Sequence, residues 1–315
     1  MVQAPNLQQA GRRRVAAIDI GTNSTNLRIV SRRDGIVDSR VTVTRLGQDV
    51  DQNHSLSEEA MQRVLSCLAD YRQVLDTYGS YALRVVASSA CRDASNREEF
   101  FLRVEKTIGI QPELLSGQDE GRLAYQGCVS NLVLDPVGHL IIDIGGGSTE
   151  IMLGTTQLDI ARSIDVGAVR ITERHLRHDP PAPEELLNAI GEVQDLFEDL
   201  LREFPEMEQA PQIIGTAGTI VTVAAVEIGQ RVFDPAGLHA FHLTRSAIED
   251  VFRTLATESL SDRSHNPGLP RDRADVIVGG CCVLVALMRS LDADEMIVSA
   301  YNILDGVCAE LLGNP

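Results

Sequence analysis

The sequence has no tryptophan, and its aromatic residues make up only 4% of the 315 positions. It also has a single lysine, Lys106, beside twenty-seven arginines. Proteins that bind single-stranded nucleic acids combine a basic groove with aromatic side chains on which the bases stack. No such combination is evident in this sequence, so we expect no nucleic-acid partner.

Long apolar runs are also missing. The longest one, residues 276–288, is shorter than the roughly 20 apolar residues that a membrane-spanning helix needs. The first dozen residues are polar and show no secretory signal. The six cysteines have no CxxC spacing and lie mostly in apolar stretches, which favours reduced thiols in the core over zinc ligands or disulfides. These absences predict a soluble, cytoplasmic protein without a membrane partner.

The charge is distributed unevenly along the chain. A length of 315 residues suggests two domains of roughly 150 residues each. Residues 1–128 contain sixteen basic and sixteen acidic residues, whereas residues 129–315 contain twelve basic and twenty-nine acidic residues. A polyanion would be attracted to the first part and repelled by the outer surface of the second. The alternative is that the acidic surface only keeps the protein soluble.

A strand–turn–strand pattern occurs twice. Residues 15–26 read VAAIDIGTNSTN, and residues 139–150 read HLIIDIGGGSTE. Each copy has an apolar strand with an aspartate near its end, Asp19 or Asp143, followed by a glycine turn and a second strand. Rossmann and Walker loops lead into a helix, so neither of them fits this pattern. The repeat predicts two duplicated domains of mixed α/β structure.

Such a turn is suited to phosphate. Glycines let the backbone approach a ligand closely, so successive N–H groups can point at phosphate oxygens. The Ser-Thr pair of each copy adds hydroxyl donors, and the aspartate beside the turn suits Mg²⁺ or its waters. One glycine turn after a strand is usually only a hairpin. Two matched copies, which we expect to face one cleft, favour phosphate binding.

The rest of the pattern alternates between helices and strands. Residues 55–58 read SLSE, a capping-box sequence that predicts the start of a helix. Ser116 is the expected cap of a further helix, which carries Glu120. We expect helices at residues 58–77, 96–107, 184–203, 220–226, 246–257, 274–288 and 302–312, and strands at residues 82–87, 113–115, 211–214 and 295–299.

Four motifs together resemble the exopolyphosphatase and guanosine pentaphosphate phosphohydrolase (Ppx/GppA) family. They are AIDIGTNS at residues 17–24, SGQDEGRL at 116–123, IDIGGGSTE at 142–150 and GTAGT at 215–219. The motifs occur in the family's order and extend over nearly the whole chain. The sequence departs from many relatives at Asp119 and Gly121, beside Glu120, which loosens any inference about substrate preference.

The resemblance implies a fold. The family belongs to the sugar-kinase, heat-shock-protein and actin superfamily, so we expect two RNase-H-like (actin-like ATPase) domains around an interdomain cleft. Domain I would cover residues 1–128 together with a final helix at about 300–315, and domain II would cover residues 129–299. Because the sequence given stops at Pro315, it resembles the short, two-domain members. A homodimer is expected from the resemblance alone.

Hydrolysis of a phosphoanhydride needs an aligned water, a group that accepts its proton, and positive charge near the transferred phosphoryl group. The family's catalytic glutamate matches Glu120, for which the alternative is a carboxylate that only interacts with the helix dipole. Asp143 and Glu150 are the best candidates for Mg²⁺ ligands, with Asp19 holding a metal-bound water more loosely. For Glu150 the alternative is a solvent-facing strand residue.

The expected substrate-binding residues lie in both glycine turns, in the GTAGT segment and after the strand at 82–87. They are Thr22, Asn23, Ser24, Arg92, Gly145, Gly146, Gly147, Ser148, Thr149, Gly218 and Thr219. Arg92 could instead be a surface residue paired with Asp93, and the GTAGT segment could be a purely structural turn. Arg271 and Arg273 resemble a family segment near the cleft, or they belong to a helix-capping loop.

The expected activity is Mg²⁺-dependent release of orthophosphate from the end of inorganic polyphosphate, with short chains preferred. Conversion of guanosine pentaphosphate to tetraphosphate is the alternative within the same class. A superfamily kinase is less favoured because no sugar-binding signature is evident. A non-enzymatic polyphosphate sensor is less favoured because Glu120, Asp143 and Glu150 are all present.

Overall fold

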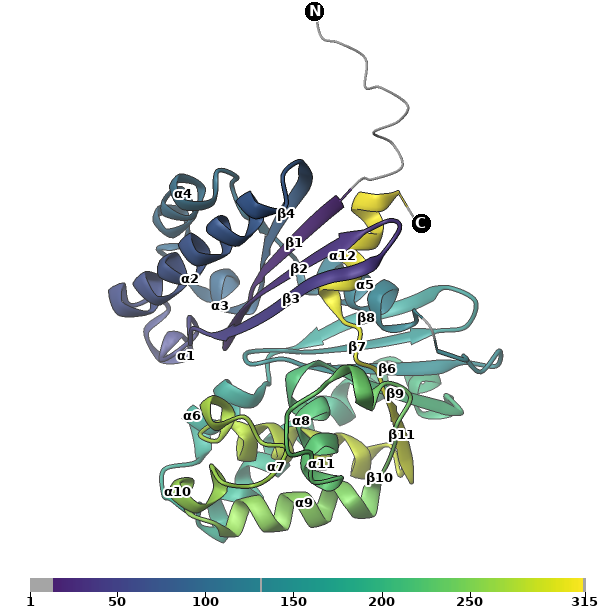
Figure 1. The fold of residues 1–315 in the computed structure, drawn as a ribbon. Coiled ribbons are helices and arrows are strands. Elements are labelled where there is room, and N and C mark those ends of the chain that lie inside the picture. Colours follow the sequence, from purple (N-terminus) through teal and green to yellow (C-terminus); the bar gives the residue numbers. More distant parts are fainter. Residues whose placement is uncertain (1–13, 131, 314–315) are drawn as a thin grey trace, which may run out of the picture. The chain divides into compact units, whose positions relative to one another are not determined.

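The computed structural model describes residues 14–130 and 132–313 and divides the chain into two compact units. Unit 1 consists of Met1–Ser116 and Ile303–Pro315, and unit 2 consists of Gly117–Asn302. Each unit contains one β-sheet with helices packed against it (Figure 1). Within the described ranges, no helix is both long enough and apolar enough to cross a membrane.

The sheet of unit 1 has five strands in the order β3-β2-β1-β4-β5. They are β1 (Arg14–Ile20), β2 (Ser24–Ser31), β3 (Gly35–Val43), β4 (Tyr81–Ala87) and β5 (Glu113–Leu114). The helices are α1 (Val50–Asn53), α2 (Glu58–Thr77), α3 (Ser89–Asp93), α4 (Arg97–Ile108) and α12 (Ile303–Leu312). One face of β1 packs with α2 and α4, while α12 lies against β1 and β2. Burial on both faces explains why β1 is almost continuously apolar.

The sheet of unit 2 has the order β10-β11-β9-β6-β7-β8. Its strands are β6 (His139–Ile144), β7 (Thr149–Gly154), β8 (Leu158–Ile164), β9 (Gln212–Thr216), β10 (His242–Thr244) and β11 (Glu295–Val298). Its helices are α5 (Gly117–Cys128), α6 (Ala168–His175), α7 (Pro183–Glu203), α8 (Ala217–Glu227), α9 (Arg245–Thr257), α10 (Leu260–Arg263) and α11 (Ile277–Ser290), with short 3-10 turns at Pro205–Gln209, Ala236–Leu238 and Arg271–Arg273.

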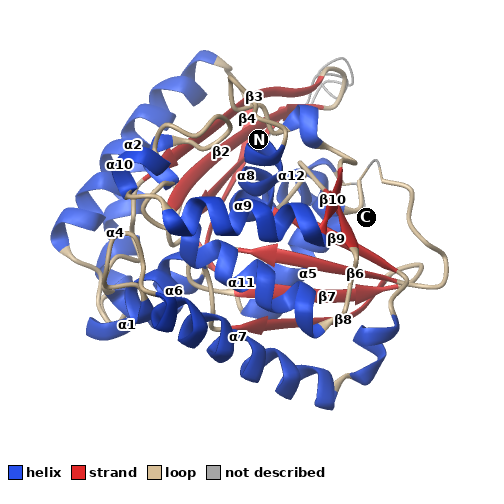
Figure 2. Ribbon diagram, turned by 90° about the horizontal axis from the view of Figure 1, so that it is seen from below, coloured by secondary structure: helices blue, strands red, loops and turns tan. Residues whose placement is uncertain are grey.

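Helix α11 contains most of the longest apolar run of the sequence. It is buried over nearly its whole length and packs against α6, α7 and α9, as Figure 2 shows from below. The run is therefore a core helix of unit 2. All six cysteines are free and buried, in agreement with the expectation of thiols in the core.

The two sheets share one topology. Unit 1 reads β3-β2-β1-β4-β5, and unit 2 contains the matching series β8-β7-β6-β9-β11. In each series the first three strands pair antiparallel and the last three pair parallel. This is the strand arrangement of RNase-H-like domains, so the predicted duplicated, actin-like α/β fold class is confirmed.

Helix α5 belongs to a different unit from the one to which the sequence assigned it. Residues 117–128 were expected in domain I, but α5 packs against β7 and β8 and is grouped with unit 2. Gly121 makes this packing close, since a Cβ there would lie 3.4 Å from the Cβ of Ala161 on β8. The chain passes from unit 1 to unit 2 between Ser116 and Gly117 and returns between Asn302 and Ile303.

Candidate active site

The glycine turn of unit 2 connects β6 to β7. The N–H of Gly145 donates to the carbonyl oxygen of Ser148 at 3.0 Å, which closes the turn. Asp143 and Glu150 face each other across the hairpin and are 8% and 1% exposed. Glu150 is therefore a buried residue, so its alternative interpretation as a solvent-facing strand residue is wrong. The hairpin places two carboxylates beside the turn.

The carbonyl groups of this turn are held by the segment that begins α6. The N–H groups of Ala168 and Val169 donate to the oxygens of Gly145 and Gly146 at 3.0 and 2.8 Å. The Nε of buried Arg170 donates to the oxygen of Gly147 at 2.8 Å. Within the part of the chain that the structure describes, the N–H groups of Gly146 and Gly147 make no hydrogen bond. Two backbone donors thus remain for the oxygens of an anion.

Three acidic residues predicted for the site interact electrostatically within unit 2. The pKa of Glu150 is raised well above its usual value, first by burial and then by the carboxylates of Glu120 and Asp143. Hydrogen bonds from Ser163 and Ser148 act in the opposite direction, and the Oγ of Ser163 donates to Oε1 of Glu150 at 2.8 Å. Two buried carboxyl groups, Asp143 and Glu150, next to the partly exposed Glu120 are typical of a site that binds a cation or a proton.

Helix α5 brings Glu120 to this cluster. Glu120 lies in the first turn of α5, and Gly117 at the start of the helix sits against Ser163. A Cβ at position 117 would lie 2.5 Å from the Cβ of Ser163, so the helix can approach β8 this closely only with glycine there. The same serine binds Glu150. Ser163 therefore contacts both the start of α5 and the buried carboxylate of Glu150.

A buried tyrosine–histidine pair fixes the other end of α5. The Oη of Tyr125 and the Nε2 of His139, the first residue of β6, are 2.9 Å apart, and the two rings are stacked at 5.6 Å. Gly154 makes room for the hydroxyl group, because a Cβ there would overlap Tyr125. Burial raises the pKa of Tyr125 to about 12 and lowers that of His139, so the pair is neutral near pH 7.

We expect Tyr125→Phe to lower both the stability and kcat. The variant leaves the Nε2 of fully buried His139 without its partner, which costs about 1–3 kcal/mol. Because α5 also carries Glu120, kcat should fall more than KM changes. Calorimetry and steady-state kinetics measure the two effects. Tyr301→Phe is the control. The ring of Tyr301 also packs against a histidine ring, that of His239, with the two ring centroids 4.9 Å apart, but Tyr301 lies outside α5. Equal losses in both variants would contradict a positioning role for Tyr125.

The glycine turn of unit 1 is built in the same way. The N–H of Gly21 donates to the oxygen of Ser24 at 3.0 Å, and the Nδ2 of Asn26 donates to Oδ2 of Asp19 at 3.1 Å. The carbonyl oxygens of Thr22 and Asn23 accept hydrogen bonds from the segment after β3, including one from the N–H of Gly47 to Thr22 at 2.8 Å. The duplication thus includes the fixed carbonyl groups of the turn. That the two turns face one cleft stays a prediction.

Arg92 lies in the last turn of α3 in unit 1, and its Nη1 donates to the carbonyl oxygen of Leu115 at 3.2 Å. Gly218 and Thr219 lie in the first turn of α8 in unit 2. The guanidinium of Arg273 lies where a Cβ on Gly218 would be, so this glycine is required by packing. Burial lowers the pKa of Arg273. Arg273, whose segment resembles one near the family's cleft, therefore contacts the GTAGT turn.

The carboxylates fit a magnesium ion, although they do not form a large cluster. Among the residues described, no group of three or more His, Cys, Asp or Glu side chains could hold a metal ion. Mg²⁺ commonly binds one or two protein carboxylates and completes its shell with waters and substrate phosphates. Asp143 and Glu150 supply such a pair, and their buried charge calls for a cation. Asp19 belongs to the other unit.

Two groups near the site carried no signal in the sequence. Ser163, which binds Glu150, lies on β8, and Arg170, which binds the turn, lies on α6. Neither β8 nor α6 was predicted. Both residues act through a contact with a distant part of the chain, and no local pattern marks such a contact. The duplication offered the one available hint, because a second hairpin implies a third strand beside it.

The chain is similar to known proteins over most of its length. The profile of the Ppx/GppA phosphatase family matches residues 28–314. Exopolyphosphatase 2 of Mycobacterium tuberculosis (strain CDC 1551 / Oshkosh) is 34% identical over 316 residues, covering 95% of this chain and 99% of that protein. The first 27 residues lie outside the matched profile, although they include Asp19 and the first glycine turn.

Solved structures give the same result. The crystal structure of an exopolyphosphatase-like protein superposes with a TM-score of 0.88 at 32% identity, covering 93% of this chain and 97% of that one. The Ppx/GppA family member of Aquifex aeolicus gives a TM-score of 0.77 at 30% identity, covering 96% and 98%. The matching family and relatives define the class of this protein, an enzyme that hydrolyses phosphoanhydrides. The chain belongs to the Ppx/GppA phosphatase family.

Proposed function

We propose that this protein is an exopolyphosphatase, which releases orthophosphate from the end of inorganic polyphosphate with the help of Mg²⁺. The observation that carries the proposal is the coupling of Glu120, Asp143 and Glu150 beside a turn with two available N–H donors. The naming of its relatives as exopolyphosphatases supports the choice of polyphosphate. The six free, buried thiols agree with a cytoplasmic location.

In the proposed reaction, water attacks the terminal phosphorus, and the bond from that phosphorus to the bridging oxygen breaks. Glu120 accepts a proton from the water as the new P–O bond forms. The N–H groups of Gly146 and Gly147 hold the oxygens of the transferred group. Asp143 and Glu150 would hold a magnesium ion, which would supply positive charge for these oxygens. The shortened chain leaves with the bridging oxygen.

An orthophosphate-release assay tests this proposal. The substrates are short polyphosphate, long polyphosphate, guanosine pentaphosphate and ATP, each with and without Mg²⁺. Release from polyphosphate that requires Mg²⁺ supports an exopolyphosphatase. Release from guanosine pentaphosphate alone would make the protein a pentaphosphate phosphohydrolase. Tight binding of polyphosphate without release from any substrate would indicate a sensor, and transfer of phosphate from ATP to a sugar would indicate a kinase.

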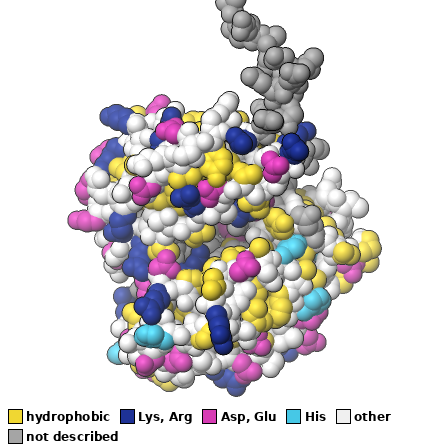
Figure 3. All heavy atoms as spheres, in the orientation of Figure 1, with side chains coloured by type: hydrophobic (Ala, Val, Ile, Leu, Met, Phe, Trp, Pro, Cys, Tyr) yellow, Lys and Arg dark blue, Asp and Glu magenta, His cyan; other side chains and the backbone are white. Residues whose placement is uncertain are grey.

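We expect KM for polyphosphate to rise with salt. Unit 2 contains thirteen basic and twenty-nine acidic residues, whereas unit 1 contains fifteen and sixteen. On the face seen in Figure 3, basic side chains lie among acidic ones. Binding of a polyanion must therefore depend on local cationic groups, whose attraction salt screens. Kinetics from about 50 to 200 mM salt measure the effect. A KM that stays constant would contradict an electrostatic contribution to binding.

A further inference from the structure

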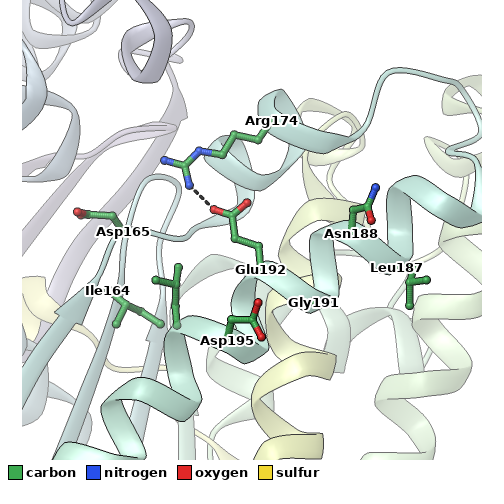
Figure 4. A pocket seen from close by; sticks show the side chains of 9 residues that line it. Ile164, Asp165, Arg174, Leu187, Asn188, Gly191, Glu192 and Asp195 are labelled. Carbon is green, nitrogen blue, oxygen red and sulfur yellow. Dashed lines mark hydrogen bonds and ion pairs between the residues drawn. The ribbon is translucent and has the colours of Figure 1, made fainter.

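A groove runs along the outward face of α7 in unit 2. It is lined by residues of the β8 end, of α6 and of α7, among them Ile164, Leu187, Gly191 and Leu196, and encloses about 840 Å³ (Figure 4). None of the groups that form the candidate active site lines it. Its volume lies in the range of binding sites, roughly 300–1,000 Å³.

Two apolar side chains of this groove, Leu187 and Leu196, do not belong to the core of unit 2. The inner face of α7 buries Val193 and Phe197, as expected for an amphipathic helix. On the outward face, Leu187 is 72% exposed and Leu196 is 38% exposed. Exposed apolar groups gathered in a groove with a polar rim are typical of a surface that contacts a partner.

After the exposed leucines, Gly191 is the second feature of the groove that the packing of unit 2 does not explain. Glycine in a helix interior costs about 0.5–1 kcal/mol relative to alanine. At Gly154 and Gly167 the neighbouring groups leave no space for a Cβ, whereas a Cβ at Gly191 would meet nothing within 4 Å. Gly191 lies between Leu187 and Asp195, one turn from each, on the wall of the groove. The missing side chain lets the backbone of another helix approach α7 closely.

The charge of the groove indicates the kind of partner. Glu192 forms ion pairs with Arg174 and with His175, the latter when the histidine is protonated. Asp165 and Asp195 are exposed, and neither forms an ion pair within the described residues. Two copies of this face would bring these carboxylates together, and an anionic partner such as polyphosphate would be repelled. A basic partner would pair with both.

We propose that this groove binds an amphipathic helix of a basic partner protein. We call it the α7 groove, and its lining includes Ile164, Asp165, Leu187, Gly191, Asp195 and Leu196. The apolar side of the helix would cover Leu187 and Leu196 and pass over Gly191, and its arginine or lysine side chains would pair with Asp165 and Asp195. This is the helix-in-groove mode of recognition, in which apolar anchors at helical spacing give affinity and flanking charges give specificity.

The probe is a fluorescein-labelled synthetic helix of about 18 residues with leucine on one side and arginine on the other. Its control contains glutamate in place of arginine. Fluorescence anisotropy with the full chain measures binding. We expect the arginine helix to bind and the glutamate helix not to bind. Asp195→Asn should weaken binding and its salt dependence, whereas Asp199→Asn, on the same helix outside the groove, should not.

The sharpest variant is Gly191→Leu, which fills the groove without disturbing the fold. Leucine favours helix over glycine, so the melting temperature should not fall. Binding of the arginine helix should weaken by about tenfold or more, since a steric block at the centre of an interface affects its most buried contacts. Orthophosphate release should stay at the wild-type level. Glu198→Leu adds the same side chain to α7 outside the groove and should leave binding unchanged.

Two results would overturn the proposal. One is an arginine helix that does not bind, or that binds the wild type and the Gly191→Leu variant equally. The other is a wild-type dimer in light scattering that becomes monomeric in the Gly191→Leu variant, because the occupant would then be a second copy of this chain. Neither result bears on the exopolyphosphatase proposal, which depends on different residues.

Discussion

Orthophosphate release by the Glu120→Gln variant is expected to be about 10²–10⁴-fold slower than that of the wild type, which is the usual contribution of a general base. Glutamine keeps the size of the side chain and its place in the first turn of α5, but it cannot accept a proton from water. The loss should be in kcat, since a group that acts mainly in the transition state contributes little to substrate binding.

The control for this variant is Asp119→Asn, which removes the neighbouring carboxylate from the same turn of α5. It should retain most of the activity. Folding of the Glu120→Gln variant should be intact or more stable, because the substitution removes one of the charges that oppose ionisation of Glu150. A Glu120→Gln enzyme with wild-type kcat would exclude Glu120 as the base, whatever the substrate.

Glu150→Gln is expected to abolish the response to Mg²⁺ while making the metal-free protein more stable. Burial and the carboxylates of Glu120 and Asp143 both disfavour the ionised form of Glu150, and this is why its pKa is raised. A neutral side chain removes the conflict and can still accept a hydrogen bond from Ser163. The melting temperature without metal should therefore rise by roughly 2 °C, because about 1 kcal/mol shifts it by roughly 2–4 °C in proteins of 150–250 residues and by less in longer ones.

The effect of Mg²⁺ on the melting temperature distinguishes a role of Glu150 in metal binding from its effect on stability. In the wild type, Mg²⁺ should raise the melting temperature, since a ligand that binds only the folded state stabilises it by mass action. In the Glu150→Gln variant the shift should be lost, and so should most of the orthophosphate release. Glu227→Gln, which changes an exposed carboxylate of unit 2, should behave like the wild type in both measurements. An unchanged Mg²⁺ shift in the Glu150→Gln variant would remove this residue from the metal site.

Together, these two variants test whether the acidic cluster destabilises the fold and is retained because catalysis needs it. Proteins rarely bury several carboxylates without a counter-charge, because removing them from water is unfavourable. The cluster is consistent with the cation that we propose for the reaction. If neither variant were more stable than the wild type in the absence of metal, the electrostatic argument for the magnesium site would lose its basis.

The sequence determined much of the fold because local rules govern it. The apolar strands before Asp19 and Asp143, with glycine and Ser-Thr after them, predicted both hairpins, which are β1–β2 and β6–β7. The sequence SLSE predicted the start of α2 at Glu58, although the cap is Ser57 and not Ser55, as the capping-box pattern implied. Each of these signals comes from residues close together in the chain, where hydrophobic periodicity and capping decide the backbone.

Strands β3 and β8 and helix α6 were not predicted. The strand β3 lies at the edge of its sheet and is mostly exposed, so it lacks the apolar alternation that marks a strand. Helix α6 has only eight residues and begins directly after Gly167, whose backbone packs against Gly146. Elements of this kind are stabilised by the neighbouring elements they pair with, and no local sequence pattern identifies those neighbours.

The candidate site likewise combines residues that the sequence predicted with contacts that depend on the tertiary structure. The sequence selected Asp143 and Glu150 because they flank a glycine turn suited to phosphate, and it selected Glu120 through the resemblance to the family. Only the tertiary structure placed α5 in unit 2, bound Ser163 to Glu150 and paired Tyr125 with His139. These contacts join segments that are separate in the chain. Their formation depends on side-chain packing at two glycines, Gly117 and Gly154, where the absence of a Cβ becomes meaningful only once the helix lies on the sheet.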